Sequence, residues 1–451
     1  MDAGVPSPAV VVRPVAARSR RELLAASVGG LVETFDWALY GVLAPKFAEQ
    51  IFPSHDHTSA VIKAYASFAV GFLFRPVGGM LLGRLADRRG RRYALTFSIA
   101  LMTLASTVLA IVPDHRTLGV GAAVVFLLAR SVQGLSAGGE APAVAAYLAE
   151  MAPPGRRYLY SGLAYAGLIV GSMLAFAVLG VLSVTLGAHG LANGGWRIGF
   201  AVCAALGGTG LWIRRTAPES EEFVRYAASG RRPRAWPVLS AHRRVSLAVF
   251  LITVGGTVGF YLGTLYLPQY AHHLNVTSTA KASGQIEVAL VVLIGAMAAF
   301  GRFADRFDAL TVVRVAVVIQ ALATVPLMLA LGAKTLPFAL VATVYLILLA
   351  PSLGIGYVLG AQLFPVEVRS LGFGVPGAVA GAIFGGTFPA VAEALWKAHH
   401  IRAVPWYTAA CAALAVLGLA LIRHEDIYRT GVDAASPQDR ADLADSSAVS
   451  P

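Results

Sequence analysis

Cysteine is scarce in this chain, and so are charged side chains. Two cysteines, Cys203 and Cys411, lie in apolar runs of a 451-residue chain, which excludes a disulfide framework and a cysteine-based metal site. Charged residues make up 13% of the chain, whereas an average soluble domain contains about 25%. The chain also lacks a nucleotide-binding P-loop, an HExxH zinc motif and any Cys/His metal spacing. We therefore expect no enzymatic activity, no cofactor and no metal.

Long apolar runs are abundant instead. The chain is 57% hydrophobic with a mean hydropathy of +0.68, which is typical of a membrane protein. A bilayer core needs about 20 apolar residues per helix, and this length predicts an all-α fold with twelve transmembrane helices. The predicted spans are 23–44, 61–82, 93–112, 118–148, 158–184, 196–213, 245–270, 284–301, 312–331, 337–364, 371–394 and 405–422.

The distribution of arginine predicts the orientation. The net charge of +12 does not indicate a nucleic-acid partner, because the arginines lie between apolar runs rather than along one face. An even number of spans puts both termini on one side, and most Lys and Arg residues fall on that side. Loops rich in Lys and Arg stay in the cytoplasm. We therefore expect a cytoplasmic segment 1–22 without a cleaved signal peptide, and a cytoplasmic, disordered tail 423–451.

The two halves of the chain resemble each other. The longest loop, 214–244, separates a predicted six-helix bundle at 23–213 from a second one at 245–422. "GRLADRR" (83–89) recurs as "GRFADRF" (301–307), and Arg157 with Gly162 recurs as Arg369 with Gly374. Such paired halves are the sequence sign of a transporter whose substrate site lies between two repeats.

The loop after the second span carries the motif "GRLADRRGRR" (83–92). A glycine permits close helix approach, and an aspartate is stabilised at the N-terminus of a neighbouring helix. The motif resembles the signature loop of the major facilitator superfamily, which implies a latch that holds the outward-open state. The residues of the implied latch are Gly83, Asp87, Arg88, Gly90, Arg91 and Arg92. The alternative is a solvated charge run that only sets topology.

The second copy of the loop keeps part of this motif. It has Gly301, Asp305 and Arg306 but continues as "FDALT" instead of the glycine and two arginines. The resemblance therefore leaves open whether the second half has a latch.

Further stretches resemble one branch of that superfamily, the metabolite–proton symporters. They are "ETFDWALYG" (33–41), "FLFRPVGG" (72–79), "RSVQGLSAGGE" (130–140), "GWRIGF" (195–200), "PESEEF" (218–223) and "LFPVEVRSLGFG" (363–374). The resemblance implies proton-coupled uptake of a small metabolite such as 2-oxoglutarate, citrate, shikimate, proline or betaine. It also implies a bacterial inner-membrane location, and we expect a monomer whose partners are its substrate, protons and lipid.

Five charged residues lie inside predicted spans of the first half: Glu33, Asp36, Arg75, Arg130 and Glu140. A charge at a helix centre costs about 2.5–3.5 kcal/mol on insertion scales, so these residues are expected to be paired or to face a wet cavity. By the resemblance, Arg75 corresponds to an arginine that binds the substrate carboxylate, and Arg130 to the arginine tied to proton coupling.

We predict that Asp36 binds the proton and that Arg130 is its switchable partner. Glu33 and Glu140 are the next candidates for the proton. The alternative is a structural ion pair that holds the first bundle together. Tyr40 shares a helix face with Asp36, and Gln133 shares one with Arg130, so both are predicted substrate contacts.

The predicted spans of the second half contain no central Lys or Arg. Polar and aromatic residues are therefore its candidates for substrate contacts: Tyr261, Tyr266, Gln269, Tyr345, Tyr357 and Gln362. Two other functions stay open. One is an efflux antiporter of the same superfamily, and the other is a substrate sensor that does not transport.

Overall fold

The computed structural model describes residues 15–54, 56–229 and 235–428, and these residues form helices and no strands. The remaining parts of the predicted N-terminal segment and C-terminal tail lie outside the described residues. The first half contains α1 (Val15–Ile51), α2 (His57–Arg89), α3 (Arg91–Ile111), α4 (His115–Leu118), α5 (Val120–Met151), α6 (Arg157–Gly190), η1 (Leu191–Gly195) and α7 (Trp196–Arg215). After α8 (Glu221–Ala228) and α9 (Ala235–Ala241) come α10 (Arg243–Tyr261), η2 (Leu262–Tyr266), α11 (Leu267–His273), α12 (Thr279–Ala304), α13 (Ala309–Gly332), α14 (Phe338–Gln362), α15 (Arg369–Ala380), η3 (Gly381–Gly385), α16 (Phe388–Lys397), η4 (Ile401–Ala403), α17 (Val404–Leu421) and η5 (His424–Asp426).

Each of the twelve predicted spans falls on a helix or on a helix continued through a short π segment. Within the described residues, eleven helices are long and apolar enough to cross a membrane. The twelfth span lies in α1, whose apolar run is interrupted by Glu33 and Asp36. The predicted twelve-helix fold is therefore confirmed, and its least apolar span is the one that carries two carboxylates.

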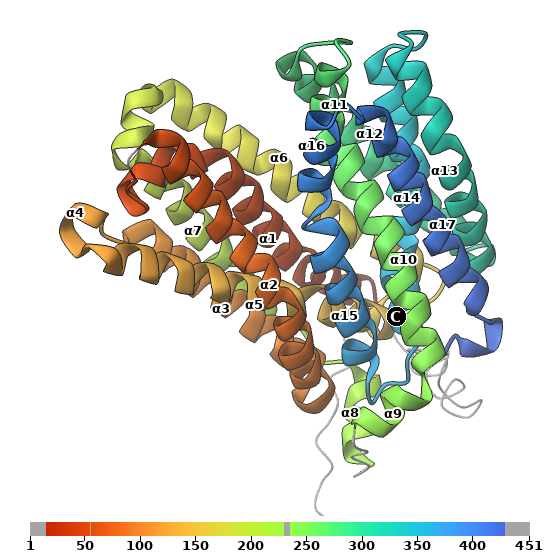
Figure 1. Cartoon of the computed structure of the whole chain (residues 1–451). Helices are drawn as coiled ribbons and strands as arrows, with labels where there is room; N and C mark the ends of the chain where they lie inside the picture. The colour runs from red at the N-terminus through yellow and green to blue at the C-terminus, as the bar shows by residue number, and fades with distance from the viewer. Residues whose placement is uncertain (1–14, 55, 230–234, 429–451) are drawn as a thin grey trace, which may run out of the picture.

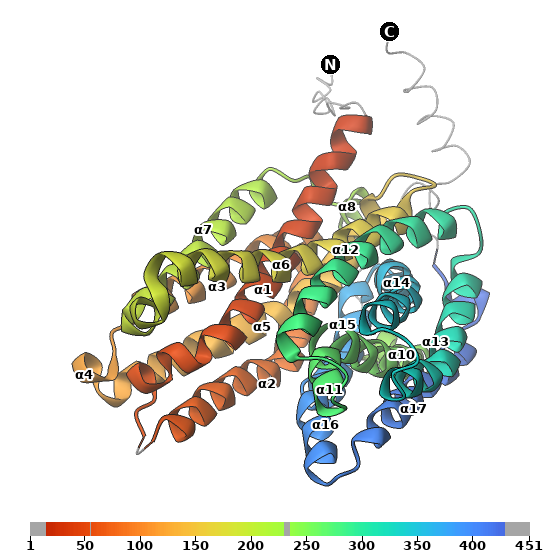
Figure 2. The ribbon, with the colours of Figure 1, turned by 90° about the horizontal axis from the view of Figure 1, so that it is seen from above.

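The helices form two groups that meet at one end and separate at the other (Figures 1 and 2). The N-bundle comprises α1–α7, and the C-bundle comprises α10–α17. The two groups converge near α8, and we call this the closed end. They diverge toward α4 and α11, and we call this the open end (Figure 1).

The two groups cross each other through equivalent pairs of helices. α2 packs against α15, and α6 packs against α12. A Cβ atom added at Gly83 of α2 would lie 3.2 Å from the Leu371 Cα of α15, and one added at Gly301 of α12 would touch the Tyr158 carbonyl oxygen of α6. The glycines of the repeated motif thus permit close approach at both crossings.

Two helices of the C-bundle are interrupted at their middle. η2 separates α10 from α11, and η3 separates α15 from α16, each as a five-residue π segment. A proline stands in the first turn of the helix that follows each break, where the missing N–H costs least. Short π segments are often found at functional sites.

Three differences from the predicted boundaries concern the ends of the chain and the central loop. α1 begins at Val15, the loop 214–244 contains α8 and α9, and the tail is ordered as far as Tyr428. The tail is held because Arg244 pairs with Asp426 and the Tyr428 N–H donates to the Gln362 carbonyl oxygen at 2.8 Å.

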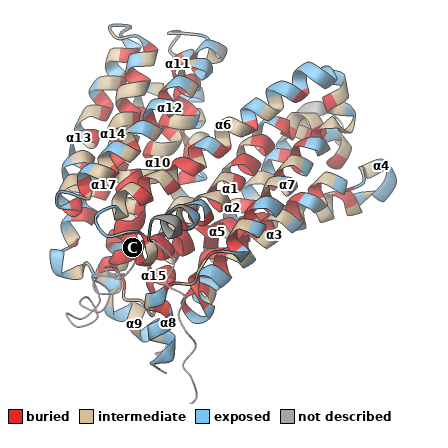
Figure 3. Ribbon diagram, turned by 180° about the vertical axis from the view of Figure 1, so that it is seen from behind, coloured by how far each residue is buried: buried red, intermediate tan, exposed pale blue. Residues whose placement is uncertain are grey.

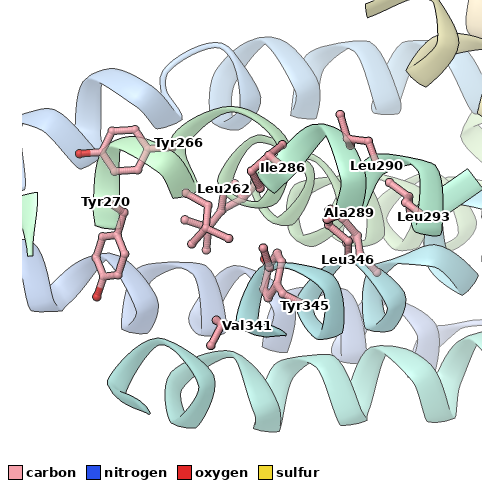
Figure 4. Close-up of a cluster of buried hydrophobic side chains, with 14 of the residues drawn as sticks. Leu262, Tyr266, Tyr270, Ile286, Ala289, Leu290, Leu293, Val341, Tyr345 and Leu346 are labelled. Carbon is pink, nitrogen blue, oxygen red and sulfur yellow. The ribbon is translucent and has the colours of Figure 1, made fainter. Parts of the chain in front are cut away.

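Buried residues concentrate where α5, α10 and α15 meet at the closed end (Figure 3). A second packed core fills the C-bundle toward the open end, where Tyr345 lies among Leu262, Val341 and Leu346 (Figure 4). Exposed apolar side chains such as Leu73, Val184 and Leu322 lie on the outer surfaces of the helices, as expected of helices that face lipid.

Candidate functional site

Asp36 of α1 lies at the centre of the N-bundle and has no exposed surface. Its Oδ2 accepts a hydrogen bond from Nη1 of Arg130 on α5 at 2.7 Å, and its Oδ1 accepts one from Nε2 of Gln133 at 2.7 Å. The Ser106 hydroxyl of α3 lies 3.4 Å from the same oxygen. The structure therefore brings together the carboxylate and the arginine that the sequence predicted as a pair.

Arg130 is only partly satisfied by this pair. Its guanidinium lies 4.1 Å from the ring centroid of Tyr40 and 4.8 Å from that of Trp37. Its Nε and Nη2 are buried without a hydrogen-bond partner. A buried unpaired donor is costly, so Arg130 has capacity to bind a further acceptor when its surroundings rearrange.

Tyr40 and Gln133 serve this pair rather than line the cavity described below. The Tyr40 hydroxyl donates to the Ala64 carbonyl oxygen at 2.8 Å and contacts the Ser67 hydroxyl. Gln133 bridges Asp36 and Ser106 and also accepts from Arg130. Both side chains are fully buried.

A second ion pair lies beside the first and is more exposed. Nη2 of Arg75 on α2 lies 3.0 Å from Oε1 of Glu33 on α1, and the two side chains are 24% and 12% exposed. The Arg75 guanidinium also stacks over Trp37, 4.4 Å from the ring centroid. Trp37 therefore contacts the guanidinium groups of both Arg75 and Arg130. Gly71 gives the ring room, since a Cβ atom there would lie 2.9 Å from it.

The Arg75–Glu33 pair lines a cavity of ≈ 290 Å³ between the two bundles, near the lower limit of about 300 Å³ for small-molecule sites. From the N-bundle it is lined by Glu33, Arg75, Gly138 and Tyr165, and from the C-bundle mainly by glycines and apolar side chains of α10, α14 and α15. Among the described residues that line it, Glu33 and Arg75 are the charged ones.

Glu140 lies elsewhere, in a buried ion pair that the sequence did not predict. Arg214 was assigned to the loop after the sixth span, but it belongs to α7 and is buried. Its Nη1 lies 2.9 Å from Glu140 Oε2, its Nη2 contacts Oε1, and it also donates to backbone oxygens of α1 and α3. This arrangement favours the structural alternative for Glu140.

At the closed end, Asp87 binds the N-terminus of α15. Its Oδ1 accepts from the Ser370 N–H at 3.1 Å, and its Oδ2 accepts from the Leu371 N–H at 2.9 Å. Arg91 lies 3.0 Å from the same carboxylate. A carboxylate at a helix N-terminus is stabilised by the helix dipole and by N–H groups that have no partner within the helix. The geometry is that of a latch between the bundles.

The other predicted latch residues surround this contact. Gly90 adopts φ 109°, which glycine tolerates and which turns the chain from α2 into α3. The N–H groups of Arg91 and Arg92 donate to the Glu219 carboxylate at the start of α3. Arg88 is exposed.

A buried charge network extends the latch. Glu150 of α5 accepts from Arg91 at 2.9 Å and from Arg369 of α15 at 2.6 Å, and Arg369 also pairs with Glu222 of α8. Glu150 was not among the residues predicted from the sequence, and the acids of "PESEEF" had no predicted partner. The sequence does contain a signal for this network, because the acid Glu150 and the arginines Arg91 and Arg369 stand at the ends of predicted spans on the same side of the membrane.

The second copy of the motif makes the equivalent contact. Asp305 accepts from the Tyr158 N–H at 2.8 Å and from the Leu159 N–H at 3.1 Å, at the N-terminus of α6. Burial raises the pKa of Asp305, so this carboxylate loses its charge at a higher pH than an exposed aspartate does. The second half therefore makes the same kind of contact between helices without the glycine and two arginines of the first copy.

Of the six candidates of the C-bundle, Tyr357 lines the cavity and the other five do not. Tyr345 donates to the Gly259 carbonyl oxygen at 3.2 Å within the packed core, and Tyr266 contacts Glu393 at 3.3 Å (Figure 4). Gln269 lies 3.4 Å from His273, and Gln362 accepts from the Tyr158 hydroxyl at 3.0 Å at the closed end. Tyr261 packs beside Phe260, which does line the cavity.

Replacing Asp87 by Asn should weaken the closed end. An amide cannot accept both N–H groups of α15, and the lost charge removes about 0.3–1 kcal/mol, up to ~2 when partly buried. Ser370 is fully buried at the contact, so a cysteine placed there by Ser370→Cys in otherwise cysteine-free protein reports opening of the closed end. In Asp87→Asn we expect about 2- to 30-fold faster maleimide labelling of this cysteine. We also expect reduced transport.

Asp308→Asn is the matched control, because Asp308 caps α13 within the C-bundle through the Thr311 N–H at 2.8 Å. Asp305→Asn should resemble Asp87→Asn. Equal labelling of Ser370→Cys in the Asp87 and Asp308 variants would mean that the motif only sets topology.

The fold and its ion pairs define a class of protein. Two groups of six membrane-spanning helices, latched at one end and enclosing a cavity with a buried charged pair, are the architecture of a secondary transporter. A family model described as Major Facilitator Superfamily matches residues 26–375. The chain belongs to the major facilitator superfamily, as the resemblance of the loop motif implied.

Curated relatives lie in the predicted branch. The chain is 36% identical to the alpha-ketoglutarate permease of Escherichia coli, over 88% of this chain and 91% of the relative. It is 30% identical to the citrate-proton symporter of Salmonella typhi, over 87% and 91% of the two chains. It is 28% identical to the shikimate transporter of Escherichia coli, over 84% and 88%. These relatives are transporters and not enzymes.

Solved structures show the same fold. The proton:xylose symporter XylE superposes with a TM-score of 0.70 at 19% identity, over 90% of this chain and 95% of XylE. The Escherichia coli fucose:proton symporter FucP superposes with a TM-score of 0.62 at 14% identity, over 89% and 98%. At these identities the comparison concerns the fold alone.

Proposed function

We propose that this protein is a proton-coupled importer of a small carboxylate or zwitterionic metabolite that works by alternating access. The observation that carries the proposal is the Arg75–Glu33 pair, which lines the cavity between the two bundles beside the buried Arg130–Asp36 pair. The names of the relatives, which include a citrate-proton symporter and a permease for alpha-ketoglutarate, support the same class of cargo.

The closed end faces the cytoplasm in this proposal. Arg88, Arg92, Arg156 and Arg302 gather there, and loops rich in arginine stay on the cytoplasmic side. Both termini then lie in the cytoplasm, and the protein resides in a bacterial inner membrane as a monomer. With the latch formed, the cavity belongs to the outward-open state.

The two ion pairs supply the coupling. The pKa of a carboxylate in a membrane span depends both on burial and on the arginine that it pairs with. When Asp36 takes a proton from the open side, it releases Arg130, whose unpaired Nε and Nη2 can then bind another acceptor. Glu33 acts as a competitor, because a substrate carboxylate must displace it from Arg75.

The charge of the cavity limits the cargo. Arg75 is the cation among its described lining residues, and Glu33 already offsets that charge. Once Glu33 or Asp36 is protonated, one substrate carboxylate restores neutrality, whereas a trivalent anion leaves excess negative charge in a low-dielectric site.

A thermal-shift screen of purified protein against carboxylates and betaines tests this selectivity. A bound ligand stabilises the folded state by an amount that rises with the logarithm of its concentration over its Kd, and that reaches about 2.7 kcal/mol at 100 times the Kd. We expect monocarboxylates or zwitterions to raise the Tm more than citrate at equal concentration and ionic strength. If citrate binds more tightly than every monocarboxylate tested, the proposed charge limit is wrong.

An efflux antiporter and a non-transporting sensor are the competing functions. Reconstitution in proteoliposomes separates them, because an importer accumulates substrate when the outside is acidic. An antiporter extrudes substrate under the same gradient, and a sensor binds substrate without moving it.

A further inference from the structure

The C-bundle side of the cavity differs in chemistry from the N-bundle side. The N-bundle contributes Glu33 and Arg75, whereas the described C-bundle residues that line the cavity contain no charged group. The apolar C-bundle residues that line the cavity include Val249, Ile252, Val313, Val317, Ala412 and Leu419. A ligand that fills this space therefore meets charge at one end and apolar surface at the other.

Three glycines on separate C-bundle elements form part of that surface. They are Gly256 of α10, Gly356 of α14 and Gly381 of η3, and each lines the cavity. A Cβ atom added at any of them would have no neighbour within 4 Å. None has a positive φ. Neither packing nor backbone torsion therefore requires glycine there.

Other glycines of the same cavity show the contrast. A Cβ atom at Gly255 would lie 2.7 Å from the Ala415 Cβ, and one at Gly374 would lie 2.7 Å from Pro142. Those glycines are needed for helix contact. Glycine inside a helix lowers stability relative to alanine, and the three open glycines leave space in the cavity that a ligand can fill.

Two hydroxyl groups on this side are engaged by their own helices, and the Gln320 amide of α13, which also lines the cavity, interacts with the Tyr345 side chain of α14. The Thr253 hydroxyl donates to the Val249 carbonyl oxygen at 2.8 Å, and the Ser352 hydroxyl donates to the Leu349 carbonyl oxygen at 2.8 Å. Aromatic surface is available from Phe260, Phe373 and Tyr357. A second carboxylate placed here would lose its hydration without gaining a cation, which is unfavourable.

We propose that Gly256, Gly356 and Gly381 form a binding surface for the apolar body of the substrate, and that the cargo is a monocarboxylate with a ring or a branched aliphatic group. Arg75 holds the carboxylate of this cargo at the opposite side of the cavity. The inference rests on the proposed transport function and specifies the substrate class of the same site.

The test compares cyclohexanecarboxylate with propionate in proteoliposomes that carry an inward proton gradient. We expect wild-type protein to take up cyclohexanecarboxylate with the higher kcat/KM. Gly356→Val should reduce the kcat/KM for cyclohexanecarboxylate at least tenfold, because an added side chain occupies the space of the ring, and should leave that for propionate within about twofold. Gly256→Ala and Gly381→Ala should cause smaller losses in the same direction.

Gly295→Val is the matched control. Gly295 of α12 is exposed, has equally open space around its Cβ position and does not line the cavity. This variant should transport both probes as the wild type does. The proposed apolar binding surface would be contradicted if the wild type preferred propionate. It would also be contradicted if Gly356→Val folded normally and lost uptake of both probes equally. Either result would leave the proposed transport of carboxylates intact. Absence of uptake and binding for every carboxylate would instead overturn the proposed function.

Discussion

Asp36→Asn should abolish uphill accumulation of substrate in proteoliposomes while leaving exchange across the membrane at least partly intact. The amide mimics the protonated carboxylate, so Arg130 is released permanently and the proton gradient no longer changes the state of the pair. The measurements are accumulation of labelled substrate under an inward proton gradient and counterflow exchange without a gradient. We expect at least a tenfold loss of the first and a smaller change of the second.

Folding must be measured in the same variant, because breaking a buried ion pair costs about 3–5 kcal/mol when a charge remains unpaired. Asn keeps one acceptor for Gln133 or Arg130, which limits this cost. Asp114→Asn is the control, since Asp114 is an aspartate that caps α4 at the surface. Continued uphill accumulation in Asp36→Asn would mean that Asp36 is not the proton-binding residue, and Glu33 would then be the next candidate. If exchange and folding are lost together, the Asp36–Arg130 pair has a structural role instead of a coupling role.

Arg75→Gln should weaken substrate binding by about 10- to 100-fold. A hydrogen bond to a charged group contributes about 1.5–3 kcal/mol, and each 1.4 kcal/mol is a factor of ten in Kd. The fold should survive for two reasons. Arg75 is partly exposed at the cavity, and Glu33, which is left without its partner, can be protonated. The measurement is the Kd from the ligand concentration dependence of the Tm.

Glu33→Gln is the informative partner of this variant. It removes the group that competes with the substrate for Arg75, so binding at neutral pH should be equal to or tighter than in the wild type. Its dependence on pH should also be weaker. If Arg75→Gln binds substrate as tightly as the wild type, the carboxylate is held by another group, and Arg130 with its two unpaired nitrogens is the next candidate.

Features that depend on local composition could be predicted from the sequence. The apolar runs predict the twelve spans, because helix length and hydropathy largely decide whether a segment can cross a bilayer, although α1 with its two carboxylates is less apolar than the other eleven. The Asp36–Arg130 pair could also be predicted, because each charge is isolated in an apolar span and needs a partner at a similar depth. The repeated "GRLADRR" and "GRFADRF" sequences predicted two related halves.

Contacts that depend on packing could not be predicted in the same way. Arg214 follows a span directly, so its sequence position is compatible with a loop, yet it turns into the bundle toward Glu140. Arg369 reaches Glu150 across 219 sequence positions, and no local pattern specifies such a pair. Tyr345 is aromatic within an apolar span, and only the structure shows that its hydroxyl is satisfied by the Gly259 carbonyl oxygen in a packed core.

The position of Trp37 has a thermodynamic consequence for the whole transport cycle. Its ring packs on both guanidinium groups, so a change at one ion pair alters the contact made by the other. Linkage then requires reciprocity: the factor by which protonation of one pair raises affinity for the substrate at the other equals the factor by which substrate raises affinity for the proton. A cation–π contact contributes about 0.5–2 kcal/mol, so coupling transmitted through this ring alone amounts to about 2- to 30-fold in each direction.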